Sequence, residues 1–307
     1  MKSYISERPA PPNSSVAALG CFDGVHIGHA AVISTAVSIA KEKSAVSAVC
    51  TFDLPPKNFF AEGSAPAITL PPEKKRLTEK LGADLFLSIP FDESISSLSP
   101  EAFFKKFLID ELNAVHVVCG FNYTFGKDAS GNVDVLSALC KEAGIGFTCI
   151  PPVELDGVAV SSSIIRKEIE AGNITLAEKY LGHTFSISGE VVDGKKLARR
   201  LGFPTINQAF PKSSVVPARG VYVTRVGIDD DCYFGITNVG VRPTVGRRSL
   251  SAETNIFDFG GDLYGKTVRV ELLRFLRPEK AFPSVEALSN QVNSDIETAK
   301  EIIKEIK

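Results

Sequence analysis

VAALGCFDGVHIGH, the sequence of residues 16–29, decides the fold of the first half of the chain. Its beginning, Val16–Gly20, is an apolar run typical of a buried strand. A glycine-bearing loop follows, and the helical pattern of Gly28–Lys43 begins where the loop ends. A loop between a strand and a helix favours anion binding, because free backbone N–H groups and the positive end of the helix dipole face the bound group. The stretch therefore predicts an α/β unit with a phosphate site.

His26 and His29 close this loop and share one face of the helix, because they are three residues apart. Two imidazoles there can donate hydrogen bonds to a polyphosphate and stabilise the charge that develops in its reaction. An ordinary polar surface and half of a metal site are the alternatives. The chain has four histidines, and the other two, His116 and His183, lie in unrelated contexts. Phosphate handling is therefore favoured.

Outward from this stretch, apolar strand-like runs alternate with helical patterns. Strands are predicted at Val16–Gly20, Ala45–Phe52, Leu85–Ile89, Val115–Cys119 and Phe147–Ile150, and helices at Gly28–Lys43, Pro72–Leu81, Pro100–Leu112, Val133–Ala143, Ser162–Ala171 and Thr175–Leu181. The alternation predicts a parallel sheet with helices on both faces. Ligands of such sheets bind outside the carboxyl ends of the strands, which is where Asn122 lies.

The pattern changes after Gly182 to a series of short strands separated by Gly, Pro and Asp turns. These are predicted at Phe185–Val192, Gly220–Val226, Cys232–Val239, Ala252–Phe257 and Lys266–Phe275, and a helix at Val285–Ile306 closes the chain. Consecutive short strands predict a small barrel. A length of 307 residues fits two domains, and we place them at residues 1–182 and 183–307.

Composition excludes several classes of protein. A formal net charge of −2 gives no global basic field for nucleic acid. No apolar run reaches the about 18 residues of a membrane span, and the polar N-terminus lacks the apolar core of a signal peptide, so a cytoplasmic protein is expected. The six cysteines form no C-x-x-C pair, which disfavours zinc and dithiol redox sites and predicts reduced, mostly buried thiols.

Two further groups have both a plain and a functional explanation. Ser162 and Ser163 begin a predicted helix, where serines are common caps. Together with Arg166, their hydroxyls also suit a pyrophosphate. Glu253 is, on its own, an ordinary strand carboxylate.

The motifs of the first half together resemble a known family. Gly-x-Phe-Asp-Gly-x-His-x-Gly-His at 20–29, Gly-x-Asn-Tyr-x-Phe-Gly at 120–126 and Ser-Ser-x-x-x-Arg at 161–166 are similar to the adenylyltransferase module of prokaryotic bifunctional riboflavin kinase/FAD synthetases. That module has a Rossmann-like nucleotidyltransferase fold. The resemblance implies that FMN's phosphate attacks the α-phosphate of ATP, a step that needs alignment, Mg²⁺ and charge neutralisation but no general base. It implies catalytic roles for His26, His29 and Arg166, and ATP contacts for Phe22, Asp23, Gly24, Gly28, Asn122, Ser162 and Ser163.

The second half closely resembles riboflavin kinase, in nearly every block from Gly189 to Asp295. Its signature block is Gly-Phe-Pro-Thr-Ile-Asn at 202–207. The resemblance implies that Thr205 and Asn207 bind Mg²⁺ and ATP phosphates, with Gly194 and Pro204 beside the nucleotide. It also implies that Glu253 is the general base on the terminal hydroxyl of riboflavin, and an alcohol does need such a base.

Some positions depart from the family patterns. Leu54-Pro55-Pro56 stands where the adenylyltransferase usually has Pro-His-Pro, and Ser163 replaces a Thr. In the kinase half, Ala198, Ile206 and Asn255 replace a Gly, an Ala and a His. The leading hypothesis is the bifunctional enzyme, with riboflavin, FMN and ATP as substrates and Mg²⁺ as its metal.

Alternatives stay open at this point. One is a riboflavin kinase with a weak or inactive adenylyltransferase domain. Others are a flavin- or nucleotide-binding module without catalysis, and a nucleotidyltransferase for another substrate. The sequence carries no indication of an oligomeric state.

Overall fold

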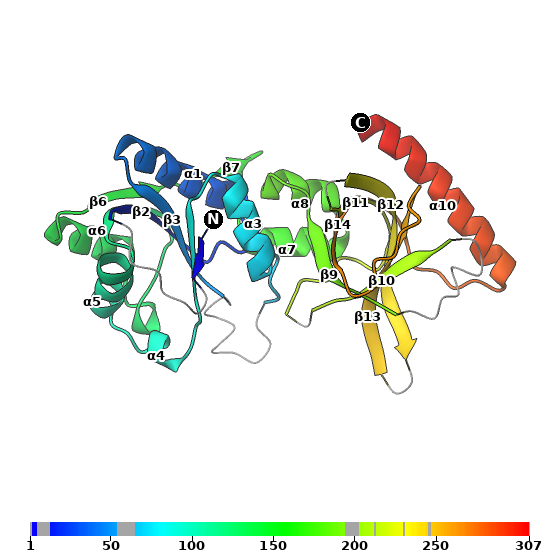
Figure 1. Cartoon of the computed structure of the whole chain (residues 1–307), viewed down its shortest axis with the longest axis horizontal. Helices are drawn as coiled ribbons and strands as arrows, with labels where there is room; N and C mark the ends of the chain where they lie inside the picture. Colours follow the sequence, from blue (N-terminus) through cyan, green and yellow to red (C-terminus); the bar gives the residue numbers. More distant parts are fainter. Residues whose placement is uncertain are drawn as a thin grey trace. The chain divides into compact units, whose positions relative to one another are not determined.

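The computed structural model describes residues 2–4, 13–53, 65–193, 203–211, 213–229, 231–244 and 247–306. They form two compact units, Met1–Ser162 and Ser163–Lys307. Figure 1 shows a helix-flanked sheet in the first unit and a barrel with a long terminal helix in the second.

A six-stranded parallel sheet forms the centre of the first unit. Its strands are β1 (Lys2–Tyr4), β2 (Ser15–Leu19), β3 (Val46–Phe52), β4 (Leu85–Ile89), β5 (Ala114–Gly120) and β6 (Gly146–Ile150), in the order β1-β4-β3-β2-β5-β6. The chain runs outward from β2 to β4 and then returns to β5 on the other side of β2. This reversal places a topological switch point between the carboxyl ends of β2 and β5. The predicted α/β class is confirmed.

Helices cover both faces of this sheet because the strand side chains alternate between two cores. Val16, Ala18 and Val49 pack against α1 (Ile27–Glu42) and α3 (Pro71–Lys80). Ala17, Leu19 and Cys50 face the opposite core, which contains α5 (Pro100–Phe103) and α6 (Val133–Glu142). Figure 1 shows the two layers of helices. The short α4 (Glu93–Ser96), the 3₁₀ turn η2 (Lys127–Ala129) and the hairpin β7 (Glu154–Leu155) and β8 (Val158–Ala159) complete the unit.

The helix predicted at Pro100–Leu112 is helical but not a single α-helix. After α5, residues Phe104–Glu111 form a π-helix, η1. Its wider turns bring residues five apart together, and Lys105 Nζ donates to Asp110 Oδ1 at 2.9 Å. Phe104, Phe107 and Leu108 are buried in the core on this face of the sheet.

A closed antiparallel barrel forms the second unit, which confirms the predicted barrel. Its strands are β9 (Ser186–Val192), β10 (Thr205–Ala209), β11 (Gly220–Ile228), β12 (Asp231–Thr244), β13 (Arg247–Ile256) and β14 (Thr267–Pro278), in the order β10-β13-β12-β11-β14-β9. The sequence analysis did not predict β10, and it ended β12 at Val239. Strand pairing instead continues through Pro243, which lies opposite Arg248.

Polar side chains bridge strands inside the barrel. Thr237 Oγ1 lies 3.1 Å from Thr224 Oγ1 and 2.8 Å from Thr254 Oγ1. Gln208 Nε2 donates to Gly189 O on β9 at 2.9 Å and to Val268 O on β14 at 2.7 Å. All four side chains are fully buried, so these bonds satisfy hydroxyl and amide groups that would otherwise be costly to bury, and of these side chains only the Gln208 Oε1 atom has no partner among the described residues. Gln208 thereby links β10 to its neighbour β9 and to β14, the strand on the far side of β9.

Two helices, α7 (Ser162–Ala171) and α8 (Ile174–Leu181), pack against this barrel. Ala218 N donates to Ile169 O at 3.2 Å, and Arg274 Nη1 donates to Thr175 Oγ1 at 3.0 Å. The division between the compact units falls after the first residue of α7, whereas the predicted domain boundary follows both helices at residue 182.

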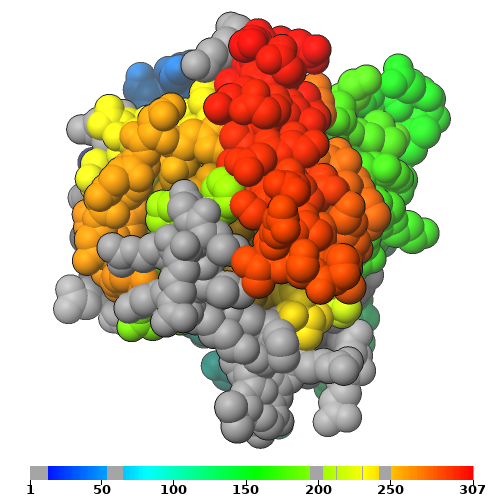
Figure 2. Space-filling model, turned by 90° about the vertical axis from the view of Figure 1, so that its right-hand side faces the viewer, coloured from blue at the N-terminus to red at the C-terminus, as the bar shows by residue number. Residues whose placement is uncertain are grey.

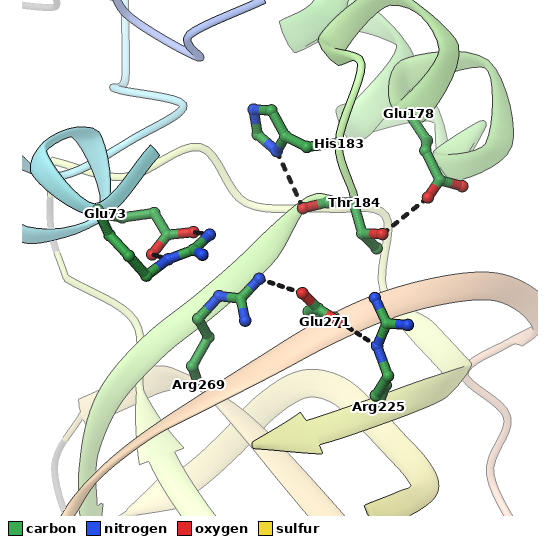
Figure 3. Close-up of polar contacts among 8 residues, drawn as sticks. Glu73, Glu178, His183, Thr184, Arg225, Arg269 and Glu271 are labelled. Carbon is green, nitrogen blue, oxygen red and sulfur yellow. Dashed lines mark hydrogen bonds and ion pairs between the residues drawn. The ribbon is translucent and has the colours of Figure 1, made fainter. Parts of the chain in front are cut away.

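A charged cluster joins β11 to β14 near these helices. Glu271 is buried and accepts hydrogen bonds from Arg225 and Arg269 (Figure 3). The Glu271 carboxylate raises the pKa of Arg225. Close by in Figure 3, Thr184 Oγ1 donates to Glu178 Oε1 at 2.7 Å, which ties the start of the barrel to α8.

The terminal helix α10 (Val285–Ile306) lies along the barrel strands, as Figure 2 shows in red against orange. Ala299 and Ile303 pack on Val221, Ile236 and Leu273. The helix therefore covers the outer face of the barrel.

The six cysteines are all free thiols, and only half of them are buried as expected. Cys50, Cys119 and Cys140 are buried, whereas Cys21, Cys149 and Cys232 are exposed. The exposed three lie at or beyond strand ends or on a solvent-facing edge, where an apolar neighbourhood in sequence does not imply burial.

Candidate active sites

The loop between β2 and α1 folds tightly over its own backbone. Phe22 and Val25 have positive φ angles of 47° and 41°, an uncommon conformation for such residues that marks a strained loop. The Phe22 ring is buried against Gly20, where an added Cβ would lie 2.9 Å from Phe22 Cε1. Gly20 is thus required by the close approach of this ring.

His26 and His29 stack on each other at the start of α1. Their ring centroids are 3.5 Å apart, and His26 Nδ1 accepts the backbone N–H of His29 at 3.3 Å. Phe22 meets the His29 ring edge-on at 5.4 Å. Burial and the nearby positive charges of His26 and Lys74 hold the pKa of His29 well below its ordinary value. His29 Nδ1 is buried and has no hydrogen-bond partner among the described residues. This atom is therefore suited to a hydrogen bond with a bound ligand.

Asp23 fastens this loop to the segment that precedes α3. Its Oδ1 accepts from the backbone N–H groups of Ile68 at 2.8 Å and Thr69 at 3.1 Å. Thr69 Oγ1 in turn accepts from Gly24 N at 2.9 Å, and Ser162 Oγ donates to Asp23 O at 2.9 Å. The backbone and side chain of Asp23 thus hold together three segments that are distant in sequence.

Asn122 lies in the turn after β5, across the switch point from the histidine loop. The turn is held by Phe121 N, which donates to Ile150 O at 2.9 Å, and by Tyr123 N, which donates to Gly120 O at 3.1 Å. Both the Asn122 turn and the histidine loop leave the carboxyl ends of neighbouring strands. Exposed Asn122 is therefore available to a ligand at this edge of the sheet.

Lys74 is a charged residue of this site that the sequence analysis missed. It is 2% exposed, and its Nζ donates to Cys21 O at 2.8 Å and to Phe52 O at 3.1 Å. Burial lowers the pKa of this lysine, while the carboxylates of Asp23 and Asp53 oppose the shift. In sequence it belongs to the run Lys74-Lys75-Arg76, which is typical of a solvent-facing surface, so no local signal distinguishes it.

In the second unit, one cross-strand row brings the predicted kinase residues together. Asn207 on β10 lies opposite Glu253 on β13, which lies opposite Asn238 on β12. Directly opposed residues of antiparallel strands project from the same face. Thr205 is two residues before Asn207 and so shares that face. Thr205, Asn207 and Glu253 are thus neighbours on the outside of the barrel.

A cavity of about 250 Å³ lies over this face, beneath the beginning of α10. Glu253, Thr205 and Asn238 line it from the strands, and Phe282 and Asp295 belong to the opposite wall. Asn255, which stands where the family usually has His, also lines it and donates from Nδ2 to Pro204 O at 2.8 Å. That bond holds the start of β10, where Thr205 lies.

A buried ion pair fastens the outer wall of this cavity. Arg277 Nε lies 2.9 Å from Asp295 Oδ1, and Arg277 Nη2 lies 2.7 Å from Asp295 Oδ2. Gln291 Nε2 donates to the same carboxylate at 2.9 Å, and Gln291 Oε1 accepts from Lys280 Nζ at 2.6 Å. The Phe282 ring lies beside both cations, with Arg277 Cζ at 5.8 Å and Lys280 Nζ at 5.3 Å from its centroid. These contacts join the end of β14 to α10.

Comparison with known proteins gives a family for each half of the chain. The family model for FAD synthetase matches residues 8–164, and the model for riboflavin kinase matches residues 181–303. A bifunctional riboflavin kinase/FMN adenylyltransferase from Pseudomonas fluorescens is 38% identical over 286 residues, which are 93% of this chain and 92% of the relative. The chain belongs to the bifunctional riboflavin kinase/FMN adenylyltransferase family.

A second curated relative has the same name, and one solved structure has a similar fold over almost the whole chain. The Bacillus subtilis enzyme of the same name is 34% identical over 290 residues, covering 93% of this chain and 91% of the relative. A crystal structure described as a macrolide-efflux protein from Streptococcus pneumoniae superposes with a TM-score of 0.84 at 33% identity, covering 96% of this chain and 95% of that one. Within the described part of this chain, we find no helix with the length and apolarity of a membrane span.

In the adenylyltransferase half, the structure brings together most of the predicted residues. Phe22, Gly24 and His26 lie in the loop before α1, Gly28 and His29 lie in its first turn, and Ser162 is bonded to the loop through Asp23. Ser163 and Arg166 belong to the second compact unit, so their part in this site stays a prediction. Leu54, Pro55 and Pro56, the altered flavin-side motif, lie outside the described residues.

In the kinase half, Thr205, Asn207 and Glu253 meet on one face, and Pro204 contributes its carbonyl to Asn255. Gly194 and Ala198 lie outside the described residues. Among the residues that are described, no group of three His, Cys, Asp or Glu side chains could hold a metal. The side-chain oxygens of Thr205 and Asn207 are hard donors of the kind that suits Mg²⁺, a metal that usually takes few protein ligands and completes its shell with phosphates and water.

Proposed function

We propose that this chain phosphorylates riboflavin with ATP to give FMN, and then transfers the AMP group of a second ATP to FMN, giving FAD and pyrophosphate. Residues 1–182 form the adenylyltransferase domain and residues 183–307 the kinase domain. Both halves match family models, and a bifunctional riboflavin kinase/FMN adenylyltransferase aligns with almost the whole chain. The observation that carries the proposal is the row Asn207–Glu253–Asn238 beside the cavity over the barrel.

In the kinase reaction, Glu253 accepts the proton of riboflavin's terminal hydroxyl as that oxygen attacks the γ-phosphate of ATP. An alcohol is a weak nucleophile until a positioned base removes its proton. Bound Mg²⁺ would neutralise the charge of the phosphates, and the oxygens of Thr205 and Asn207 would hold it. Gly194 and Pro204 lie beside the nucleotide in this proposal. The partly exposed Glu253 lines the cavity, so its carboxylate is accessible to a substrate hydroxyl.

In the adenylyltransferase reaction, the FMN phosphate attacks the α-phosphate of ATP and pyrophosphate leaves. The phosphate monoester is already largely ionised near pH 7, so this step requires no general base. His26 and His29 donate hydrogen bonds to the ATP phosphates at the positive end of α1. Phe22, Asp23, Gly24 and Gly28 shape the loop, Asn122 contacts the nucleotide, and Ser162, Ser163 and Arg166 bind phosphates from the opposite side.

The deciding experiment incubates the full chain with riboflavin, ATP and Mg²⁺ and resolves the flavin products over time. We expect FMN first and FAD after it. The Glu253→Gln variant should form FMN at least about 10²-fold more slowly, yet convert supplied FMN to FAD at the wild-type rate. Glu190→Gln, which alters an exposed carboxylate on β9, is the matched control and should leave both rates unchanged.

One alternative has a specific observation in its favour. The Leu54-Pro55-Pro56 segment departs from the family's usual motif, which favours a riboflavin kinase with a weak or inactive adenylyltransferase domain. In that case the same assay would accumulate FMN without FAD. Unchanged FMN formation by Glu253→Gln would instead refute the assignment of the base.

A further inference from the structure

Lys74 is a buried cation at the edge of the sheet where the histidine loop begins. Its two hydrogen-bond acceptors, Cys21 O and Phe52 O, are uncharged carbonyls that follow or end the neighbouring strands β2 and β3. Burying an ammonium is expensive, because neutral carbonyls replace only part of its hydration. The ordinary solution for a helix residue at this position would be a neutral side chain. The burial of the charged Lys74 at this position therefore suggests that the charge has a function in the neighbouring site.

The nearest acidic side chains are engaged elsewhere. Asp23 Oδ1 accepts from two backbone N–H groups of the segment before α3. Asp53 Oδ1 accepts from Phe91 N at 3.1 Å. The negative charges of both carboxylates raise the pKa of Lys74 and so partly oppose the effect of its burial. The direct partners of the ammonium carry no negative charge, so its field extends into its surroundings.

The same ammonium also acts on the geometry of the histidine loop. The Cys21 carbonyl that it holds immediately precedes Phe22, the residue with a φ of 47°. The Phe22 ring contacts His29 edge-on, at 5.4 Å between centroids. A second donor, Thr51 Oγ1, reaches the same Cys21 carbonyl at 3.0 Å. Two donors hold the Cys21 carbonyl and thereby fix the turn that orients His29. The positive charge of Lys74 also contributes to the lowered pKa of His29.

We propose that Lys74 is a positioning residue of the adenylyltransferase site, which fixes the Cys21–Phe22 turn behind His29 and supplies a positive charge beside the bound ATP phosphates. This inference rests on the proposed adenylyl transfer. In this proposal the site requires the charge of Lys74 and not only its hydrogen bond to the Cys21 carbonyl. Thr51 makes an uncharged hydrogen bond to the same carbonyl, so a Thr51 variant tests the loss of such a bond without the loss of a charge.

The test measures conversion of supplied FMN to FAD by the full chain, with kcat and the KM for ATP determined separately. Lys74→Met should lower kcat/KM for ATP by about 10²-fold, including a clear rise in KM. Lys74→Arg keeps the charge, and its kcat/KM for ATP should be at least about tenfold higher than that of Lys74→Met. Thr51→Val removes the neutral bond and should remain within about threefold of wild type. Formation of FMN from riboflavin by the same preparations is the internal reference and should not change.

The possible failures are distinguishable. A Lys74→Met protein with wild-type ATP kinetics overturns the inference and leaves the proposed function intact. Equal losses in Lys74→Met and Thr51→Val would show that holding the Cys21 carbonyl in place is sufficient, and this result would overturn the role of the charge. If Lys74→Met does not fold, Lys74→Gln, which keeps donors without charge, carries the test with the same expectations. A wild-type chain that forms no FAD would sink the proposed adenylyl transfer and this inference with it.

Discussion

At the scale of single residues, His29 illustrates how a loop can select the protonation state of a side chain. Its ring lies between the stacked His26 ring and the edge of Phe22, with the positive charge of Lys74 nearby. Burial and like charges both disfavour the imidazolium. Without a ligand, His29 is therefore a neutral imidazole at pH 7, with a buried Nδ1 that has no partner among the described residues.

This protonation state predicts how stability depends on pH. An unfolded histidine titrates near 6.5, whereas folded His29 stays neutral well below that value. Below pH 6.5 the unfolded state binds the extra proton, so stability is fully present above pH 6.5 and falls as the pH drops toward the folded pKa. Between pH 7 and 5.5, the wild type should lose about 1 kcal/mol more of its unfolding free energy than His29→Gln.

Urea titration with hydrogen exchange of β2 and β3 in the full, ligand-free chain measures this difference. His183→Gln, which alters a partly buried histidine of the second unit, is the matched control and should follow the wild type. Equal acid sensitivity of wild type and His29→Gln would refute the assignment of the depressed pKa to this residue.

At the scale of elements, the cavity over the barrel depends on how α10 is attached. Apolar contacts of Ala299 and Ile303 hold the middle and end of the helix. Its first half is held by the Arg277–Asp295 pair, in which Asp295 is 5% exposed. Since Asp295 also lines the cavity, the ion pair fixes the α10 wall of the cavity opposite the row Asn207–Glu253–Asn238.

Asp295→Asn should therefore weaken both stability and riboflavin binding. Removing one partner of a buried pair leaves the other charge uncompensated, and here we expect a loss of about 2 kcal/mol in unfolding free energy. The KM for riboflavin should rise several-fold, because the wall is less well fixed. Lys304→Gln, which breaks an exposed pair with Glu301 on the same helix, is the control and should change neither. Wild-type stability and KM in Asp295→Asn would contradict this role of the pair.

At the scale of the whole molecule, the residues of the proposed kinase reaction lie within one compact unit, and the histidine loop lies within the other. A defect in one site should therefore leave the other intact. FMN is the product of one proposed reaction and the substrate of the other. If it is released to solution, two chains with complementary defects can share it.

We expect a mixture of His29→Ala and Glu253→Gln chains to make FAD from riboflavin, although neither variant does so alone at an appreciable rate. FMN should accumulate before FAD, and this lag should shorten as the Glu253→Gln concentration is raised. Product analysis over time measures both effects. A mixture that forms FMN but no FAD, while Glu253→Gln still converts supplied FMN, would show that FMN does not pass through solution.

The sequence by itself determined the architecture and the chemistry of both halves. Local patterns were sufficient because a buried strand, a helix start or a turn depends on neighbours within a few residues. The histidine loop and the barrel series were recognisable in this way, whereas Thr205 and Asn207 were assigned from the resemblance to riboflavin kinase. The strand β10 was missed because its five residues show no apolar alternation, and its place depends on pairing with β13 and β9.

Tertiary structure alone decided which charges are buried and what they contact. Lys74 looks like its neighbours Lys75 and Arg76 in sequence, yet its helix turns it toward the carbonyls of Cys21 and Phe52. Arg277 and Asp295 are 18 residues apart, and only the packing of α10 on the barrel brings them together. Such contacts depend on how separate elements pack. The free energy of burying a charge is set by those distant partners, which no local pattern in the sequence records.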